Sequence, residues 1–274
     1  MSKFMVACVQ ICAGNDLQAN LARSSELIYE AANSGAELIC LPEFYCLLCS
    51  ADESYFAQSY EESDHPALEH GRFAAQKSGC WLLLGSIPVR SAESGRVFNR
   101  SYVLAPDGHV AARYDKLHLF DVAIGDGQPY QESKGVVPGS SAAIASLPWG
   151  ALGLSICYDL RFPQLYRTLA QAGAHFLAVP AAFTAKTGAA HWHTLLRARA
   201  IETGCFVFAP AQSGERPWGR KTYGHSLIID PWGEILGDAG EDEGIVLAEI
   251  EPQRVESVRR MIPSLRHDRP IRVS

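Results

Sequence analysis

The sequence lacks several features that would assign it to a large class of proteins. It has no apolar run long enough to cross a membrane, no low-complexity tract and no evident linker between domains. It has no cluster of lysine and arginine outside the stretch from Arg254 to Arg272, and 30 acidic against 24 basic residues give a net charge of −6. These absences argue against a nucleic-acid or membrane partner. The C-terminal stretch alternates arginine with apolar and acidic residues, which favours a packed or partner-contacting arm.

A disulfide framework is also not indicated. The chain has 274 residues, and its eight cysteines lie mostly inside apolar runs such as Val6-Ala-Cys-Val9 and Leu38-Ile-Cys-Leu41. This placement predicts reduced, buried thiols. The apolar character of the first residues is interrupted at Gln10, which predicts a first strand rather than a signal peptide. We therefore expect a cytoplasmic protein.

Hydrophobic periodicity predicts an α/β protein, because short apolar runs alternate with longer amphipathic stretches. Each predicted helix is followed by a glycine that can end it. The predicted strands are 4–11, 36–42, 80–87, 99–105, 151–157, 175–181, 205–211, 224–230 and 244–250, and the predicted helices are 17–34, 66–78, 163–172 and 190–203.

The two halves of the sequence repeat the same landmarks. The pairs are Gly35 to Pro42 with Gly173 to Pro180, Gly79-Cys80 with Gly204-Cys205, and Pro106-Asp-Gly108 with Pro231-Trp-Gly233. We interpret them as two similar units folded into one domain, residues 1–250, with two packed sheets and the helices outside. Residues 251–274 then form the arm. The alternative is chance agreement, since glycine and proline punctuate turns everywhere.

Three predicted strands are followed by groups that can react. Glu43 follows the run that ends at Pro42, Lys116 lies beyond a predicted hairpin, and Cys157 ends the strand 151–157. Taken singly, a cysteine usually packs as a small hydrophobe and a charged side chain usually lies at the surface. Together they supply the base, the cation and the thiol that nucleophilic catalysis requires.

The segments around these residues resemble the three signatures of the nitrilase, or carbon-nitrogen hydrolase, superfamily. They are Leu-Pro-Glu-Phe at 41–44, Tyr-Asp-Lys-Leu-His-Leu-Phe at 114–120 and Cys-Tyr-Asp-Leu-Arg-Phe-Pro-Gln at 157–164. The resemblance covers residues 4–250 and implies a four-layer α-β-β-α sandwich of two mixed sheets with internal pseudo-two-fold symmetry. It further implies dimerisation and a triad of Glu43, Lys116 and Cys157, and we expect a homodimer or higher homo-oligomer with no cofactor and no metal. Glu132 resembles the second glutamate of the family, which supports the lysine; the alternative is an exposed loop carboxylate.

The triad residues can be assigned physical roles. Glu43 is predicted to be the general base for the Cys157 thiol and later for water, with its pKa raised by a water-poor pocket. Lys116 is predicted to lower the pKa of the thiol and to face the negative charge on the substrate oxygen. The backbone N–H of Tyr158 is the predicted second oxyanion donor. Attack on an amide would release ammonia and leave a thioester for water to cleave.

The residues after the cysteine resemble the amidase branch of the family. The stretch from Tyr158 to Pro163 is similar to amidases that act on ω-amides of dicarboxylate-like substrates, and later stretches, such as Thr187 to Trp192, resemble deaminated glutathione amidases. The resemblance implies a small amide that carries a carboxylate, such as deaminated glutathione or a similar ω-amide of a keto acid. Ala189 stands where those relatives commonly have proline, which leaves the shape of that loop open.

Three further residues are candidates for substrate binding. Arg161 can bind a substrate carboxylate with its guanidinium fork, although an ion pair with Asp159 is equally compatible with the sequence. Phe183 and Trp192 are predicted to border the pocket, and core packing is the alternative for Trp192.

Parts of the sequence are also compatible with functions other than an amidase. A metal enzyme could use ligands from the fragments His191-x-His193 and Cys46-x-x-Cys49, with His65 and His70. Residues two apart on a helix point away from each other, however, and no second Cys-x-x-Cys pair is present. A partner-binding protein on the same fold would not need an intact triad. An N-carbamoyl amino acid hydrolase and a nitrilase remain alternatives within the family.

Overall fold

The computed structural model describes residues 2–50, 55–93, 95–125, 127, 130–270 and 272. Its helices are α1 (Leu17–Asn33), α2 (Pro66–Ser78), α3 (Pro163–Gln171), α4 (Ala185–Thr203) and α5 (Gln253–Met261), with short 3-10 helices that include η4 (Cys157–Arg161) and η5 (Ser264–Arg266). Its strands are β1 (Phe4–Gln10), β2 (Leu38–Cys40), β3 (Trp81–Leu83), β4 (Ile87–Arg90), β5 (Val97–Leu104), β6 (Val110–Asp115), β7 (Asp121–Val122), β8 (Tyr130–Gln131), β9 (Ile144–Leu147), β10 (Gly150–Leu154), β11 (Ala174–Ala178), β12 (Phe206–Ala209), β13 (Leu227–Ile229), β14 (Ile235–Asp238) and β15 (Gly244–Ile250).

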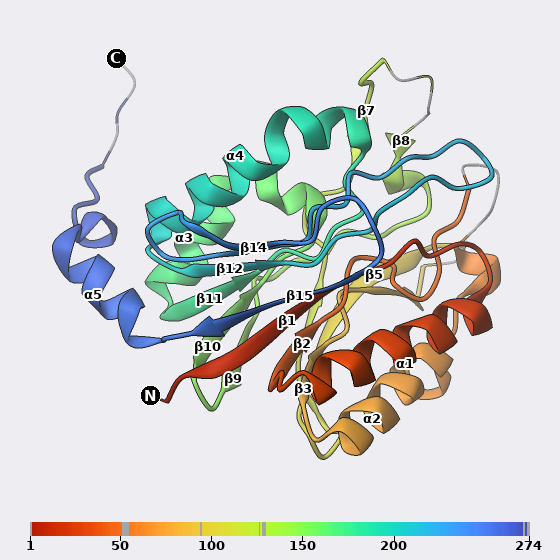
Figure 1. Ribbon diagram of the computed structural model, residues 1–274. Coiled ribbons are helices and arrows are strands. Elements are labelled where there is room, and N and C mark those ends of the chain that lie inside the picture. The colour runs from red at the N-terminus through yellow and green to blue at the C-terminus, as the bar shows by residue number, and fades with distance from the viewer. Residues whose placement is uncertain are drawn as a thin grey trace.

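Two mixed sheets lie between two pairs of helices (Figure 1). The helices α1 and α2 cover the first sheet, and α3 and α4 cover the second. The predicted four-layer α/β class is confirmed. None of the helices in the described ranges has the length and apolar character needed to cross a membrane.

The two sheets repeat one topology. The first has the order β15-β1-β2-β3-β5-β4, with β6 also paired to β5, and the second has the order β14-β13-β12-β11-β10-β9. In both, three parallel strands (β1 to β3, or β10 to β12) are flanked on one side by an antiparallel strand, β15 or β9, and on the other by β5 or β13. The predicted internal repeat is therefore present in the strand order.

The repeat extends to single side chains. Gly79 and Gly204 end α2 and α4 in the left-handed conformation, with φ of 69° and 59°, which glycine adopts without strain. The cysteine after each glycine then donates to a carbonyl of the neighbouring strand region. The Sγ of Cys80 lies 3.1 Å from the oxygen of Ala36, and that of Cys205 lies 3.3 Å from the oxygen of Ala174.

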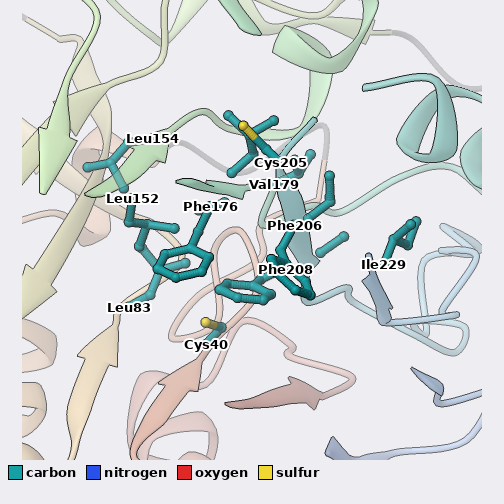
Figure 2. Close-up of a cluster of buried hydrophobic side chains, with 14 of the residues drawn as sticks. Cys40, Leu83, Leu152, Leu154, Phe176, Val179, Cys205, Phe206, Phe208 and Ile229 are labelled. Atoms are coloured by element: carbon teal, nitrogen blue, oxygen red, sulfur yellow. The ribbon is translucent and has the colours of Figure 1, made fainter. Parts of the chain in front are cut away.

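The largest apolar core lies between the two sheets. Cys40 and Leu83 from the first sheet face Leu152, Phe176 and Phe208 from the second (Figure 2). The rings of Phe176 and Phe208 stack at 5.5 Å. A second core fills the space between the first sheet and its two covering helices. Both cores follow from the apolar runs of the parallel strands, which are buried on both faces.

The helix α4 begins five residues before its predicted start at residue 190. Thr184 caps it, because its side-chain oxygen accepts from the N–H of Thr187. Gly188 lies inside the helix, and the Tyr223 side chain packs against it. A Cβ at position 188 would lie 2.3 Å from that side chain, which explains why this helical residue is a glycine. The loop whose shape Ala189 left open is therefore the beginning of α4.

The described part of the C-terminal arm packs on the same chain. Val255 and Val258 of α5 are buried, and the Arg259 guanidinium donates to the carbonyl of Ala174 at 2.7 Å. Asp268 pairs with Arg167 of α3. The predicted arm also includes residues 271, 273 and 274, which lie outside the described residues.

Candidate active site

A cavity of about 530 Å³ lies where β2, β10 and β11 end. Its lining includes six of the eight residues that the sequence singled out, namely Glu43, Lys116, Glu132, Cys157, Tyr158 and Phe183. The other two, Arg161 and Trp192, do not line it. Glu132 belongs to the stretch Gln-Pro-Tyr-Gln-Glu-Ser at 128–133, whose first two residues, Gln128 and Pro129, lie outside the described residues.

Cys157 lies on a sharp turn between a strand and a helix. The chain leaves β10, adopts a φ of 48° at Cys157 and enters η4 directly. A positive φ is strained for a residue with a Cβ, and such strain persists only where the surroundings hold it. The N–H of Cys157 donates to the carbonyl of Pro180 at 2.9 Å. Tyr158 is the second residue of η4, so its N–H belongs to the first helical turn, where N–H groups lack an intrahelical partner.

The Asp159 carboxylate stabilises this turn through hydrogen bonds. Its fully buried carboxylate accepts from the N–H of Ile156 at 2.8 Å and from the hydroxyl of Tyr114 at 2.7 Å. It also accepts from the N–H of His118 at 3.0 Å. Tyr114 and His118 flank Lys116 in sequence, so one carboxylate ties the lysine segment to the cysteine turn. The sequence had suggested Asp159 only as a partner for Arg161, and the structure gives it different partners.

Lys116 is buried between two carboxylates. Its Nζ lies 2.8 Å from Oε1 of Glu43 and 2.9 Å from Oε2 of Glu132. Asn99, a buried polar residue of β5, donates to Oε1 of Glu43 at 2.9 Å and to Oε1 of Glu132 at 3.2 Å. Buried charges are stable only when they are paired and hydrogen-bonded, and this cluster meets both conditions. Glu132 is thus a partner of Lys116, not an exposed loop carboxylate.

The charges in the cluster correct the expected pKa of Glu43, and they limit the lowering of the Cys157 pKa that was expected from Lys116. Burial opposes ionisation of Glu43, but Lys116 outweighs it and lowers the pKa of this carboxyl below its usual value. The expected rise is therefore wrong. Burial and the negative charge of Glu43 raise the pKa of the Cys157 thiol well above its usual value, and Lys116 offsets only part of this. The resting pair is an ionised carboxylate beside a protonated thiol.

The position of Glu43 depends on a close approach between two backbone segments. Gly85 follows β3 with a φ of 39°, and a Cβ there would lie 2.0 Å from the carbonyl oxygen of Pro42. Only glycine fits at this contact. Across the cavity, the N–H of Ala182 donates to Oε2 of Glu43 at 2.8 Å. The carboxylate is therefore oriented by both halves of the chain.

Of the three predicted substrate-binding residues, Phe183 alone lines the cavity. Trp192 lies behind it, fully buried, with the ring centroids 5.0 Å apart and its indole N–H donating to the carbonyl of His225. Trp192 is therefore a core residue, which was the alternative interpretation. The Arg161 guanidinium lies over the Phe183 ring at 5.4 Å and contacts His191. It forms no ion pair with any described residue.

Sequence reasoning missed several residues at the site. Asn99 is followed in its strand by Arg100 and Ser101, so its polar character did not single it out in the sequence. Tyr55, Trp218 and Arg220 also line the cavity, but they lie in irregular segments whose sequence carries no periodic signal.

His191 and His193 do not come together as ligands of one metal site. His191 contacts Arg161, whereas His193 faces Asp238, 3.1 Å away. His193, His225 and Asp238 form a cluster in the described part of the chain that could hold a metal ion. Asp238 already contacts both imidazole rings, and the cluster lies outside the cavity lining. The two imidazole rings and the Asp238 carboxylate are therefore hydrogen-bond partners of one another without a metal ion.

Comparison with known proteins places this geometry in context. The profile of the family described as carbon-nitrogen hydrolase matches residues 5–260. A protein of Synechocystis sp. named deaminated glutathione amidase is 45% identical over 97% of this chain and 98% of that protein. The human protein of the same name is 40% identical over 97% of this chain and 82% of its own length. Among solved structures, the NitFhit protein of C. elegans superposes with a TM-score of 0.90 at 35% identity, over 98% of this chain and 66% of that protein.

Proposed function

The chain belongs to the carbon-nitrogen hydrolase family, and from this premise we propose that it hydrolyses deaminated glutathione, or a close ω-amide of a keto acid, through a thioester on Cys157. The family and the amidase class that the sequence predicts are confirmed by the matches. The substrate and the roles of the individual residues are our proposal.

The observation that carries the proposal is the group of three side chains in one cavity. Lys116 contacts Glu43 at 2.8 Å, and Glu43 interacts with the thiol of Cys157. A nucleophile beside a base, with the base oriented by a third group, is the arrangement that covalent catalysis requires.

The pKa directions determine how the first step proceeds. Because the thiol is protonated at rest, Glu43 takes its proton as Sγ attacks the amide carbon. The negative charge that develops on the substrate oxygen faces Lys116 and the N–H of Tyr158. The tetrahedral species then collapses, Glu43 gives the proton to the leaving nitrogen, and the C–N bond breaks. In the second half, Glu43 takes a proton from water, which cleaves the thioester and restores the thiol.

We assign the acyl end of the substrate to the side of the cavity that Phe183 forms. Arg161 lies over this ring and is free of any ion pair with a described residue. Its guanidinium is not part of the cavity lining, so we propose that its charge favours a keto-acid carboxylate placed against the Phe183 ring without binding it directly.

The amine product depends on the substrate. A primary ω-amide releases ammonia, as the sequence analysis expected. Deaminated glutathione keeps the amide bond between its five-carbon keto acid and cysteinylglycine, so its hydrolysis releases α-ketoglutarate and cysteinylglycine. Glu43 protonates the leaving nitrogen in both cases.

The test is a product assay on purified protein. We expect deaminated glutathione to yield α-ketoglutarate and cysteinylglycine in equal amounts, and Cys157→Ala to abolish both. Mass spectrometry of a rapidly acid-quenched reaction should locate an α-ketoglutaryl group on Cys157. Preference for nitriles, or release of carbon dioxide from N-carbamoyl amino acids at a higher kcat/KM, would contradict the proposal.

We also propose that the protein is a cytoplasmic homodimer, and we propose no nucleic-acid partner. Ile201, Trp232 and Ile262 are half or more exposed and line a second cavity of about 380 Å³ beside α4 and α5. Exposed apolar groups of this kind support self-association. All eight cysteines are free thiols, which suits a reducing compartment. Sedimentation analysis should give a dimer, and Ile201→Asp should shift it towards monomer.

A further inference from the structure

The charged groups that line the cavity are not balanced. Glu43 and Glu132 both pair with Lys116. The other two cations in the lining, Arg220 and Lys134, have no hydrogen-bond or ion-pair partner for their side chains among the described residues. The cavity therefore holds positive charge that neither carboxylate neutralises, which suits an anionic ligand.

The segment that presents Arg220 is held firmly. Arg216 is 3% exposed, and its guanidinium donates to the carbonyl of Ala13 at 3.1 Å and to Oε1 of Gln212 at 2.8 Å. The N–H of Arg216 in turn donates to the carbonyl of Arg220 at 3.0 Å. The backbone at Arg220 is thus tied to a buried anchor, so its side chain is presented from a defined position.

Two donors on this segment are buried without an acceptor among the residues that the structure describes. They are Nε of Arg220 and Nε1 of Trp218, and both residues line the cavity. Buried donors in folded proteins nearly always have a partner, because leaving them unpaired is unfavourable. A ligand in the cavity that carries acceptor oxygens would satisfy both.

The neighbours of Arg220 indicate which end of the substrate it meets. Phe44 follows Glu43 directly, and its ring stacks on Tyr55 at 4.5 Å. Tyr55 lines the same cavity as Arg220 and Glu43. Tyr55 therefore connects Arg220 to the side of the cavity where Glu43 protonates the leaving nitrogen.

We propose that Arg220, together with the indole N–H of Trp218, binds the terminal carboxylate of the leaving group. The site would then select amides whose amine part is a short anionic peptide over primary amides. This inference rests on the proposed function and adds to it where the amine product binds. In deaminated glutathione the group concerned is the glycine carboxylate, two residues from the scissile bond and at most about 7 Å away along the chain.

The experiment compares three substrates with the same acyl group. These are deaminated glutathione, its analogue with a C-terminal amide, and α-ketoglutaramate, a primary amide. We expect Arg220→Gln to lower kcat/KM for deaminated glutathione by about tenfold or more, mainly through KM, because a charge-assisted hydrogen bond is lost. Its kcat/KM for α-ketoglutaramate should stay within about twofold of wild type. The kcat/KM for the amide analogue should be about equally low in wild type and in Arg220→Gln, because the pair of Arg220 and the terminal carboxylate lacks at least one partner in both cases.

Two variants serve as matched controls. Lys221→Gln removes the same charge from an exposed neighbour that does not line the cavity, and it should leave all three substrates unchanged. Arg220→Lys keeps the charge and should restore part of the loss. If Lys134→Gln, and not Arg220→Gln, produced the selective loss, the role of Arg220 would be wrong.

The outcomes separate the two proposals. If wild type hydrolyses both keto-acid amides and Arg220→Gln lowers kcat/KM for both equally, the proposed role of Arg220 is wrong and the proposed function stands. If wild type hydrolyses neither, the proposed function falls and the inference falls with it.

Discussion

The two halves of the chain share a sheet topology but contribute different chemistry. The first half supplies the ionised groups Glu43 and Lys116, and the second supplies the thiol of Cys157 on its strained turn. The residue after Pro42 is Glu43, whereas the residue after Pro180, its counterpart in the repeat, is Ala181, which is fully buried. The repeated scaffold therefore provides equivalent strand ends, and single residues at those ends decide what each half does.

The strongest test of this division removes one group from each half. Lys116→Met and Cys157→Ala should each lower kcat by about 10⁴-fold or more, and the double variant should be no worse than the poorer single variant. When two groups act as one unit, removing either of them already abolishes their joint contribution to kcat, so removing the second causes little further loss. Steady-state kinetics of the three proteins on one amide measures this.

Additive losses would mean that the halves act independently. A suitable folding control is the near-ultraviolet circular dichroism of each variant, because Lys116→Met leaves two buried carboxylates without their cation.

The next test concerns Asp159, which joins the halves. Asp159→Asn should destabilise the protein by about 2–4 kcal/mol, because its buried carboxylate accepts from Tyr114, His118 and Ile156 and an amide cannot accept from all three. The turn that holds Cys157 should loosen, and kcat should fall by at least about tenfold. Tyr114→Phe removes only one of these hydrogen bonds and should therefore destabilise the protein less than Asp159→Asn does. Thermal unfolding and kcat measured on the same samples check both effects, and an active but unstable Asp159→Asn would contradict a role in holding the turn.

The sequence allowed the scaffold, and the proximity of Glu43, Lys116 and Cys157, to be predicted for a physical reason. Strand periodicity, turn glycines and residues directly after apolar runs are local features, and in this fold the ends of parallel strands meet at one edge. Glu43 and Cys157 could therefore be placed together without knowing the packing. The start of α4 was missed because Gly188 resembles a break, whereas Tyr223 packs on it in three dimensions.

The remaining residues could not be predicted because their roles depend on contacts distant in sequence. Asn99 reaches Glu43 and Glu132 from another strand. The pKa directions of Glu43 and Cys157 depend on which of several opposing charges lies nearest, and that is a property of the folded cluster. Arg220 became a candidate only because its Nε is buried with no acceptor in the described parts of the chain.

A smaller effect is expected for the paired cysteines. Cys80 and Cys205 make the same S–H contact in their respective halves, but Cys205 is fully buried and also accepts from Arg259 of α5 at 2.9 Å. Cys205→Ala should therefore lower the free energy of unfolding by about 2 kcal/mol and Cys80→Ala by about 1 kcal/mol. Chemical denaturation measures the difference. Equal losses would indicate that the arm adds nothing to the second half.

The smallest effect concerns the caps of the corresponding helices α2 and α4. His65 caps α2 by accepting from the N–H of Ala67, whereas Thr184 caps α4 with a hydroxyl that does not titrate in this range. Burial lowers the pKa of His65 below its usual 6.5, so the folded state favours the neutral ring. As pH falls below 6.5 the unfolded chain takes up a proton that the folded chain resists, and this part of the stability is lost as pH passes through the lower folded pKa.

His65→Asn keeps a capping oxygen but cannot be protonated, so its melting temperature should fall less between pH 7 and pH 5 than that of wild type. Thr184→Asn, the matched change at the other cap, should leave the pH dependence as it is. A wild-type slope in His65→Asn would mean that the proton uptake belongs to other groups, and the two caps would then be equivalent despite their different side chains.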